Sequence, residues 1–255
     1  MKDKKLIFVS NDDGIDAPGL KKLIDMVRPY GEVFVVAPEH GQSGMSHSIS
    51  LLKPLRTKTY LKEDGLTIIA VPGTPVDCVK LALNQLLPKK PDIMVSGINH
   101  GSNSAISVIY SGTMGAAIES GFYGIPSIGF SLLDYSKDAD FDLAVKYSEK
   151  IFLHILENGL PEFVSLNVNF PAIKEKDFKG IKVCKQTQGV WKEEFEKRKD
   201  PYGFDYYWLT GEFHNFQPED TETDEYALKN NYAAIVPVKI DFTDYSCLEK
   251  LKKIF

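Results

Sequence analysis

Apolar runs alternate with amphipathic stretches along the first part of the chain. Two short runs, 6–9 and 33–37, consist of aliphatic and aromatic residues, which is typical of strands that are covered on both faces of a parallel sheet. Between them, apolar residues recur at helical spacing over 20–27. The pattern therefore predicts a β-α-β unit with a right-handed crossover.

The same alternation continues as far as residue 168. Thr74 followed by Pro75 favours the start of a helix, because threonine caps free N–H groups and proline suits the first turn. That helix ends before Pro88. We also predict helices at 114–123 and 141–156, and strands at 49–56, 65–71, 93–95, 127–130 and 163–168. This order predicts an α/β fold with a doubly wound, mostly parallel, Rossmann-like sheet.

The character of the chain changes from about residue 174. Short strand candidates at 180–186 and 206–210 are separated by a charged stretch, which predicts an extended β-hairpin arm. A strand at 232–240 and a short lysine-rich helix at 247–255 close the chain. We therefore expect an α/β core over 1–173, and over 174–255 an arm and a C-terminal strand and helix that return to it, together one functional domain.

Composition narrows the classes of partner. The 255 residues carry a net charge of −5, which disfavours binding to a nucleic-acid polymer. The three cysteines, Cys78, Cys184 and Cys247, show no metal-binding spacing and are typical of reduced thiols. No apolar stretch reaches the length of a membrane span. We expect a cytoplasmic protein that acts on a small molecule, without a membrane or a nucleic-acid polymer as partner.

Polar loops follow several of the predicted parallel strands. Asn11, Asp12 and Asp13 come directly after the first strand, Ser43 follows the second, and Asn99 follows the strand at 93–95. Ligands bind at the carboxyl ends of strands in such sheets. Two adjacent carboxylates at the mouth of a buried strand need a cation or strong donors, and an oxygen-preferring ion such as Mg²⁺ or Mn²⁺ fits them.

A cluster of small residues, Ser111, Gly112 and Thr113, begins the helix predicted at 114–123. Free N–H groups at a helix N-terminus favour an anion such as phosphate. Carboxylates for a metal together with a phosphate cradle indicate phosphoryl chemistry. The sequence has no G-x-G-x-x-G after the first strand, no Walker-type lysine loop and no G-x-S-x-G elbow, which disfavours dinucleotide, P-loop and serine-hydrolase chemistry.

Several motifs, in order along the chain, closely resemble those of SurE, the stationary-phase survival protein family of metal-dependent nucleotidases. They are VSNDDGIDAPG at 9–19, VVAP at 35–38, QSG at 42–44, GTPVDCV at 73–79, SGINHGSN at 96–103, YSGTMGAA at 110–117, DPYG at 200–203, YYWL at 206–209 and TD at 223–224. Departures from the family pattern are confined to the arm and tail, where Glu222 and Asn230-Asn231 stand in place of glycines.

The resemblance implies hydrolysis of nucleoside 5′- and 3′-monophosphates, and in some members of short polyphosphate, with one divalent metal ion per subunit, Mg²⁺ or Mn²⁺. It also implies a homodimer or homotetramer formed through the C-terminal arm. Asp12 and Asp13 would be catalytic. The implied metal ligands are Asp12, Asp13, Ser43 and Asn99, and the implied phosphate contacts are Asn11, Asn103, Ser111, Gly112 and Thr113.

Several alternatives stay open at this point. The phosphorus could be attacked by water or by Asp12 itself. His47 and His100 are candidate proton donors, although a lone loop histidine is more often structural. A nucleotide- or phosphate-binding sensor with the same metal site is the alternative to an enzyme. A phosphoryl-receiver switch is disfavoured because Pro72-Gly73 stands where its acceptor aspartate would be, and a haloacid-dehalogenase phosphatase because Asp-x-Asp is absent.

Overall fold

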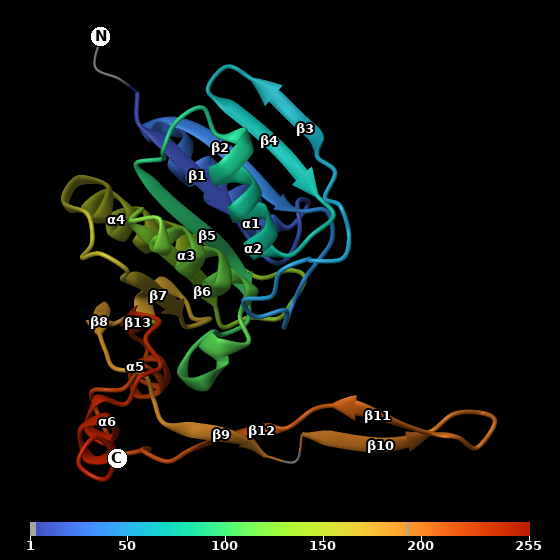
Figure 1. Ribbon diagram of the computed structural model, residues 1–255, viewed down its shortest axis with the longest axis vertical. Helices are drawn as coiled ribbons and strands as arrows, with labels where there is room; N and C mark the ends of the chain where they lie inside the picture. Colours follow the sequence, from blue (N-terminus) through green and yellow to red (C-terminus); the bar gives the residue numbers. More distant parts are fainter. Residues whose placement is uncertain (1–3, 193) are drawn as a thin grey trace.

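The computed structural model describes residues 4–192 and 194–255. Its centre is a nine-stranded sheet with the strand order β3-β4-β2-β1-β5-β6-β7-β13-β8 (Figure 1). Only β3 against β4 and β13 against β7 are antiparallel, so the sheet is mostly parallel. Its strands are β1 (Leu6–Ser10), β2 (Glu32–Pro38), β3 (Lys58–Glu63), β4 (Leu66–Val71), β5 (Ile93–His100), β6 (Ser127–Leu132), β7 (Ser165–Phe170), β8 (Ile181–Val183) and β13 (Ala233–Val238).

Helices cover both faces of the sheet. Helices α1 (Pro18–Val27) and α4 (Asp142–Asn158) contact each other on one face, and α2 (Pro75–Leu81) and α3 (Gly112–Phe122) contact each other on the opposite face. The central strands are buried on both sides: in β1, for example, alternate side chains enter two separate apolar cores. Continuous apolar strands therefore occur where parallel pairing requires them.

The direction of strand addition reverses at β1. This strand pairs with β2 on one side and with β5 on the other, so the chain builds one half of the sheet and then returns to build the other. The loops that leave β1 and β5 separate at this point and open a crevice at the carboxyl ends of the strands. Ser10 and Ser96 are register partners there, so the loop after β1 begins beside the last residues of β5, 97–100.

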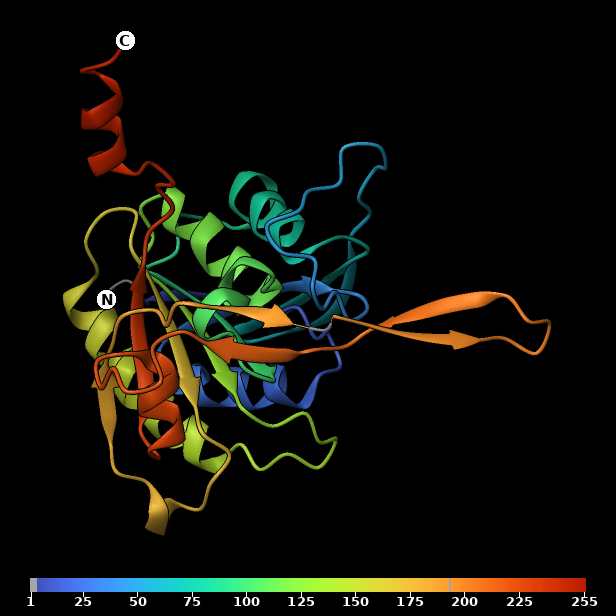
Figure 2. The same cartoon turned by 90° about the horizontal axis from the view of Figure 1, so that it is seen from below.

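The C-terminal part leaves the sheet and returns to it. It forms a long two-stranded arm that projects from the body (Figures 1 and 2). Helix α5 (Asp224–Lys229) packs on β13, and α6 (Tyr245–Leu251) lies near the end of the chain. The strands of the arm, paired β9 with β12 and β10 with β11, are β9 (Gly189–Lys192), β10 (Phe195–Lys199), β11 (Asp205–Leu209) and β12 (Glu212–Asn215).

The predicted doubly wound sheet with an extended hairpin arm is confirmed, but the strand expected at 49–56 is wrong. Those residues form no regular element, and the side chains of Leu51 and Leu52 are 81% and 96% exposed. Pro54 in this stretch lacks the N–H that a ladder needs. The strand before the 64–65 turn is instead β3, an edge strand that pairs with β4. In the described residues no helix is both long and apolar enough to cross a bilayer.

Candidate functional site

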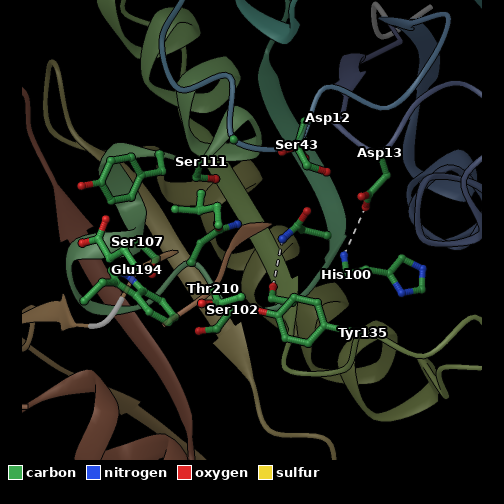
Figure 3. Close-up of a pocket in the computed structure, with 17 residues that line it drawn as sticks. Asp12, Asp13, Ser43, His100, Ser102, Ser107, Ser111, Tyr135, Glu194 and Thr210 are labelled. Carbon is green, nitrogen blue, oxygen red and sulfur yellow. Dashed lines mark hydrogen bonds between the residues drawn. The ribbon is translucent and has the colours of Figure 1, made fainter. Parts of the chain in front are cut away.

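A pocket of about 830 Å³ opens at the crevice between the loops after β1 and β5 (Figure 3). Asp12, Asp13 and Ser43 lie at one end of the view and Glu194, from the arm, at the other. The residues that line the pocket are Asp12, Asp13, Ser43, Gly44, Asn99, His100, Gly101, Ser102, Asn103, Ser107, Tyr110, Ser111, Tyr135, Trp191, Glu194, Leu209 and Thr210.

Asp12 is the most deeply held acid of the pocket. Only 4% of it is exposed, and the hydroxyl of Thr113 donates a hydrogen bond to its Oδ1. Burial, and then the charge of Asp13, raise the pKa of Asp12 to about 6, although the Thr113 hydroxyl acts in the opposite direction. A carboxylate in this position is electrostatically unsatisfied without a cation.

Asp13 is less buried and faces the loop at the end of β5. The backbone N–H of His100 donates to its Oδ2 over 3.1 Å. Burial raises the pKa of Asp13, while the hydrogen bond from His100 lowers it. The two carboxylates therefore present two negative charges at one end of the pocket, with few donors to compensate them.

An irregularity in β5 determines the position of Asn99 at the pocket. The register between β5 and β6 shifts between Ser96 and Asn99, and Gly97 has a φ of +120°. A Cβ on Gly97 would lie 2.3 Å from the carbonyl oxygen of Phe130, so only glycine fits. Bulges re-aim side chains beside functional sites. The Asn99 Nδ2 donates to the Gly101 carbonyl over 2.9 Å, which makes its Oδ1 the atom that can bind a cation.

Ser43 lies on an exposed loop that two hydrogen bonds attach to the region of α3. Backbone N–H of Ser46 donates to the carbonyl of Tyr110 over 3.0 Å. Nε2 of His47 lies 2.8 Å from a carboxylate oxygen of Glu119 on α3. These contacts hold the loop near the start of α3. His47, one of the two candidate proton donors, thus pairs with Glu119 and does not line the pocket.

The N-terminus of α3 lies against Asp12. Ser111 is its N-cap and accepts a hydrogen bond of 3.0 Å from the backbone N–H of Met114. A Cβ on Gly112 would lie 2.7 Å from the Cβ of Asp12, so glycine allows the helix to approach the carboxylate. The hydroxyl of Thr113 is fully buried and points to Asp12, which gives this residue a role in holding the acid.

Asn103 and Asn11 differ in their access to the pocket. Asn103 lines it, and its Nδ2 donates to the Ser131 Oγ over 2.8 Å. Asn11 is buried behind Asp12; its Nδ2 donates to the carbonyl of Gly14 over 2.9 Å, and its Oδ1 has no partner among the described residues.

The structure brings together most of the predicted site residues. Six of them, Asp12, Asp13, Ser43, Asn99, Asn103 and Ser111, line the pocket, whereas the side chains of Asn11 and Thr113 and the backbone of Gly112 lie directly behind it. The backbone N–H of His100 holds Asp13, but its ring packs edge-on against Phe141, with 5.0 Å between the centroids.

Reasoning from the sequence missed the apolar walls of the pocket. Tyr110, Tyr135, Trp191 and Leu209 line it and are all at least 36% exposed. Tyr110 and Leu209 belong to the motifs YSGTMGAA and YYWL, which are the available signal, whereas Tyr135 and Trp191 belong to no such motif. Trp191 and Leu209 come from the arm, and their approach to the pocket depends on how the whole chain folds. Aromatic faces of this kind can stack against a planar ring.

The oxygen donors fit a hard divalent ion. In the described part of the chain, no group of three or more histidine, cysteine, aspartate or glutamate side chains could hold a metal. The pocket instead offers two carboxylates together with neutral oxygens from Ser43 and Asn99. Mg²⁺ and Mn²⁺ bind through one or two carboxylates, neutral oxygens and water. Burial and the neighbouring charge of Asp13 raise the pKa of Asp12, and a bound cation would offset both effects.

Comparisons with known proteins agree with this site. The family model of survival protein SurE matches residues 7–193. A 5′-nucleotidase SurE of Flavobacterium psychrophilum is 53% identical over 249 residues, which cover 97% of this chain and 96% of the relative. A 5′-nucleotidase SurE of Flavobacterium johnsoniae is 52% identical, covering 98% and 97%.

A solved structure is similar as well. The SurE protein of Aquifex aeolicus has a TM-score of 0.83 and 36% identity to this chain, and the match covers 98% of this chain and 99% of that one. With a matching family model and relatives of this identity over nearly their whole length, the chain belongs to the SurE family.

Proposed function

We propose that this protein is a divalent-metal-dependent nucleotidase that hydrolyses nucleoside 5′- and 3′-monophosphates to nucleoside and phosphate. The observation that carries the proposal is the pocket itself. It joins an acidic, oxygen-rich end at Asp12 and Asp13 to aromatic walls from Tyr110, Tyr135 and Trp191. The acidic end suits a metal-bound phosphate, and the aromatic walls suit a nucleoside.

One Mg²⁺ or Mn²⁺ ion would be held by Asp12, Asp13, Ser43 and Asn99. When bound, it would supply Lewis-acid polarisation of the phosphoryl group. Thr113 keeps Asp12 in place through its hydroxyl, and the backbone N–H of His100 does the same for Asp13. Both carboxylates then meet the ion in a fixed orientation, at little cost in side-chain entropy.

The phosphate would lie between these carboxylates and the start of α3. N–H groups at the start of α3, around Ser111 and Gly112, would stabilise the negative charge on the phosphoryl oxygens. Thr113 would support them from behind, because its backbone N–H and its hydroxyl both bond Asp12. Asn103 would contact the phosphate through its side chain, and Asn11 would support the loop from behind.

The nucleophile is either water or Asp12, and both fit this arrangement. Acid-quench trapping distinguishes them, because only attack by Asp12 forms a phosphorylated enzyme.

The names of the relatives support the proposed reaction. Proteins that are 53% and 52% identical over nearly their whole length are called 5′-nucleotidase SurE. Activity on 3′-monophosphates and on short polyphosphate is our extension of that activity. The rival function is a nucleotide sensor without turnover.

Removal of the metal separates the enzyme from the sensor. We expect wild-type protein to release phosphate from several nucleoside monophosphates, to lose about 10²-fold or more of this activity in EDTA, and to regain it with Mg²⁺ or Mn²⁺. The measurement is phosphate release across a panel of 5′- and 3′-monophosphates and tripolyphosphate. Nucleotide binding without release under any of these conditions would make the protein a sensor.

The arm is the proposed contact between subunits of a homodimer or homotetramer. Four apolar side chains on it are more than half exposed: Phe195, Tyr207, Trp208 and Leu209. Apolar surface of this kind commonly marks an interface.

The three cysteines are free, which supports a reducing, cytoplasmic location. Because β8 and β13 join the core sheet, we treat residues 1–173 and 174–255 as one functional unit.

A further inference from the structure

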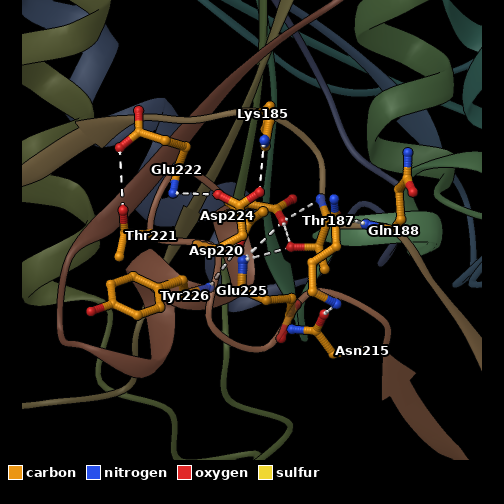
Figure 4. A network of polar contacts seen from close by, with 12 residues as sticks. Lys185, Thr187, Gln188, Asn215, Asp220, Thr221, Glu222, Asp224, Glu225 and Tyr226 are labelled. Atoms are coloured by element: carbon orange, nitrogen blue, oxygen red, sulfur yellow. Dashed lines mark hydrogen bonds and ion pairs between the residues drawn. The ribbon is translucent and has the colours of Figure 1, made fainter.

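Asp224 is a buried carboxylate that the proposed reaction does not use. It is the first residue of α5 and is completely inaccessible to solvent. An ionised carboxylate in this position is costly unless donors surround it. Its contacts come from N–H and O–H groups on three separate segments. Figure 4 shows the side of Asp224 that faces Thr187 and Glu225.

One carboxylate oxygen binds the pocket loop. The backbone N–H of Ala105 donates to Asp224 Oδ2 over 2.8 Å. Ala105 has a φ of +50°, a conformation that residues with a side chain rarely adopt and that surrounding contacts must maintain. It begins the 3₁₀ helix Ala105–Ile109. Asn103 lies just before this turn, and Ser107 within it also lines the pocket.

The other oxygen binds the root of the arm. Asp224 Oδ1 accepts hydrogen bonds from the Thr187 N–H over 2.9 Å and from the Thr187 hydroxyl over 2.5 Å. The N–H of Glu225 donates to the same oxygen over 2.9 Å. Thr187 lies just before β9, the strand that carries Trp191 to the pocket wall.

Two further hydrogen bonds hold the same loop at 103–105. The hydroxyl of Ser104 donates to the carboxylate of Glu225, and the N–H of Asn103 donates to Asn169 Oδ1 over 2.8 Å. The loop at 103–105 is therefore bound to the sheet through Asn169 and to α5 through Asp224 and Glu225. The arm root is bound to the same end of α5.

We propose that Asp224 is a positioning residue for substrate binding, which joins the 103–110 segment of the pocket to the root of the arm. The inference rests on the proposed function only for the nature of the substrate. The phosphate end of the pocket and its arm wall come from distant parts of the chain. Asp224 hydrogen-bonds both of them directly, one through each carboxylate oxygen, so its loss weakens substrate binding while the carboxylates of Asp12 and Asp13 stay in place.

The test is Asp224→Asn, which keeps the shape of the side chain. Three donors face Oδ1 and one faces Oδ2, so the amide oxygen keeps the Thr187 side and the amide nitrogen meets the N–H of Ala105. This sets donor against donor and releases the pocket loop. We expect KM for nucleoside monophosphates to rise roughly tenfold, with kcat and Mn²⁺ affinity within about twofold of wild type.

Hydrogen exchange measures the same positioning without turnover. Amides of 103–110 should exchange faster in Asp224→Asn than in wild type. The control is Glu222→Gln, which removes one negative charge from the same segment at an exposed position and should change neither KM nor exchange. If Asp224→Asn does not fold, a milder variant is Thr187→Val. It removes the hydroxyl that donates to Asp224 Oδ1 and accepts from the N–H of Glu225, keeps the hydrogen bond from the Thr187 N–H, and should raise KM about threefold.

Unchanged KM and unchanged exchange at 103–110 would overturn the proposal. A lower kcat with the KM of wild type would also overturn it, because that is the signature of a smaller folded fraction rather than of a misplaced pocket. If wild-type protein hydrolyses no nucleotide, the proposed function fails, and the exchange comparison still decides whether Asp224 positions the loop.

Discussion

Asp12→Asn is expected to reduce phosphate release by about 10³-fold, the upper part of the range for losing one preorganised electrostatic contact. The amide can keep the hydrogen bond from the Thr113 hydroxyl through its oxygen. Its NH₂ group would then face the position where a cation and phosphate bind, and a donor there opposes a cation. The measurement is kcat/KM for the best nucleotide of the panel with saturating Mg²⁺ or Mn²⁺.

The stability of the same variant should change in the opposite direction. In wild type without metal, burial and the charge of Asp13 raise the pKa of Asp12 from 3.8 to about 6. Above pH 6 the group is ionised in the folded and in the unfolded chain, so folding bears the cost of the buried charge. We therefore expect Asp12→Asn to have the higher Tm at pH 8 in EDTA.

The pH dependence of that difference follows from the sign of the shift. Well below its unfolded pKa of 3.8, Asp12 is protonated in both the folded and the unfolded chain, and its cost disappears. The Tm advantage of Asp12→Asn should therefore grow between about pH 4 and about pH 6 and then stay constant. A variant that is inactive and also less stable across this range would indicate general misfolding, and would contradict the role of Asp12 as a cation ligand.

The sequence was sufficient to predict elements in which local pattern and tertiary packing agree. The runs at 6–9 and 33–37 became strands buried on both faces, since such runs satisfy both sides of a parallel sheet. Thr74 forms a capping box with Asp77, as its position before Pro75 indicated. At 49–56 the side chains of Ile49, Leu51 and Leu52 are exposed and only Leu55 packs against a core, which pattern alone could not reveal.

The acidic end of the pocket was predictable for a similar reason. Asp12 and Asp13 follow a strand directly, so their place at the edge of the sheet is fixed by local sequence and by the fold class. The roles of Thr113 and Asp224 were not accessible in this way. Thr113 donates to Asp12 across 101 positions of sequence, and Asp224 binds Ala105 across 119. Such contacts exist only once the whole chain has folded.

Gly112→Ala tests the close packing of α3 on the acidic pair. The added Cβ would lie 2.7 Å from the Cβ of Asp12, 2.9 Å from its Oδ2 and 3.1 Å from the Cγ of Pro75. Contacts this short force the carboxylate or the helix to move. A displacement of this kind in a catalytic group can cost about 10²-fold in rate, and we expect kcat/KM to fall by about that factor.

Helix propensity makes this result diagnostic. By propensity alone, alanine is more favourable than glycine in a helix by about 1 kcal/mol, so a loss of activity cannot be attributed to a weaker helix.

The matched control is Gly41→Ala. Its added Cβ would lie 3.5 Å from its nearest atom, the carbonyl oxygen of Asp13, which is an ordinary contact distance. It should keep kcat/KM within roughly twofold. Equal activity of Gly112→Ala and Gly41→Ala would mean that the position of Asp12 relative to α3 does not limit the reaction. A selective loss in Gly112→Ala, with its Tm preserved, would place the helix N-terminus and Asp12 in one catalytic unit.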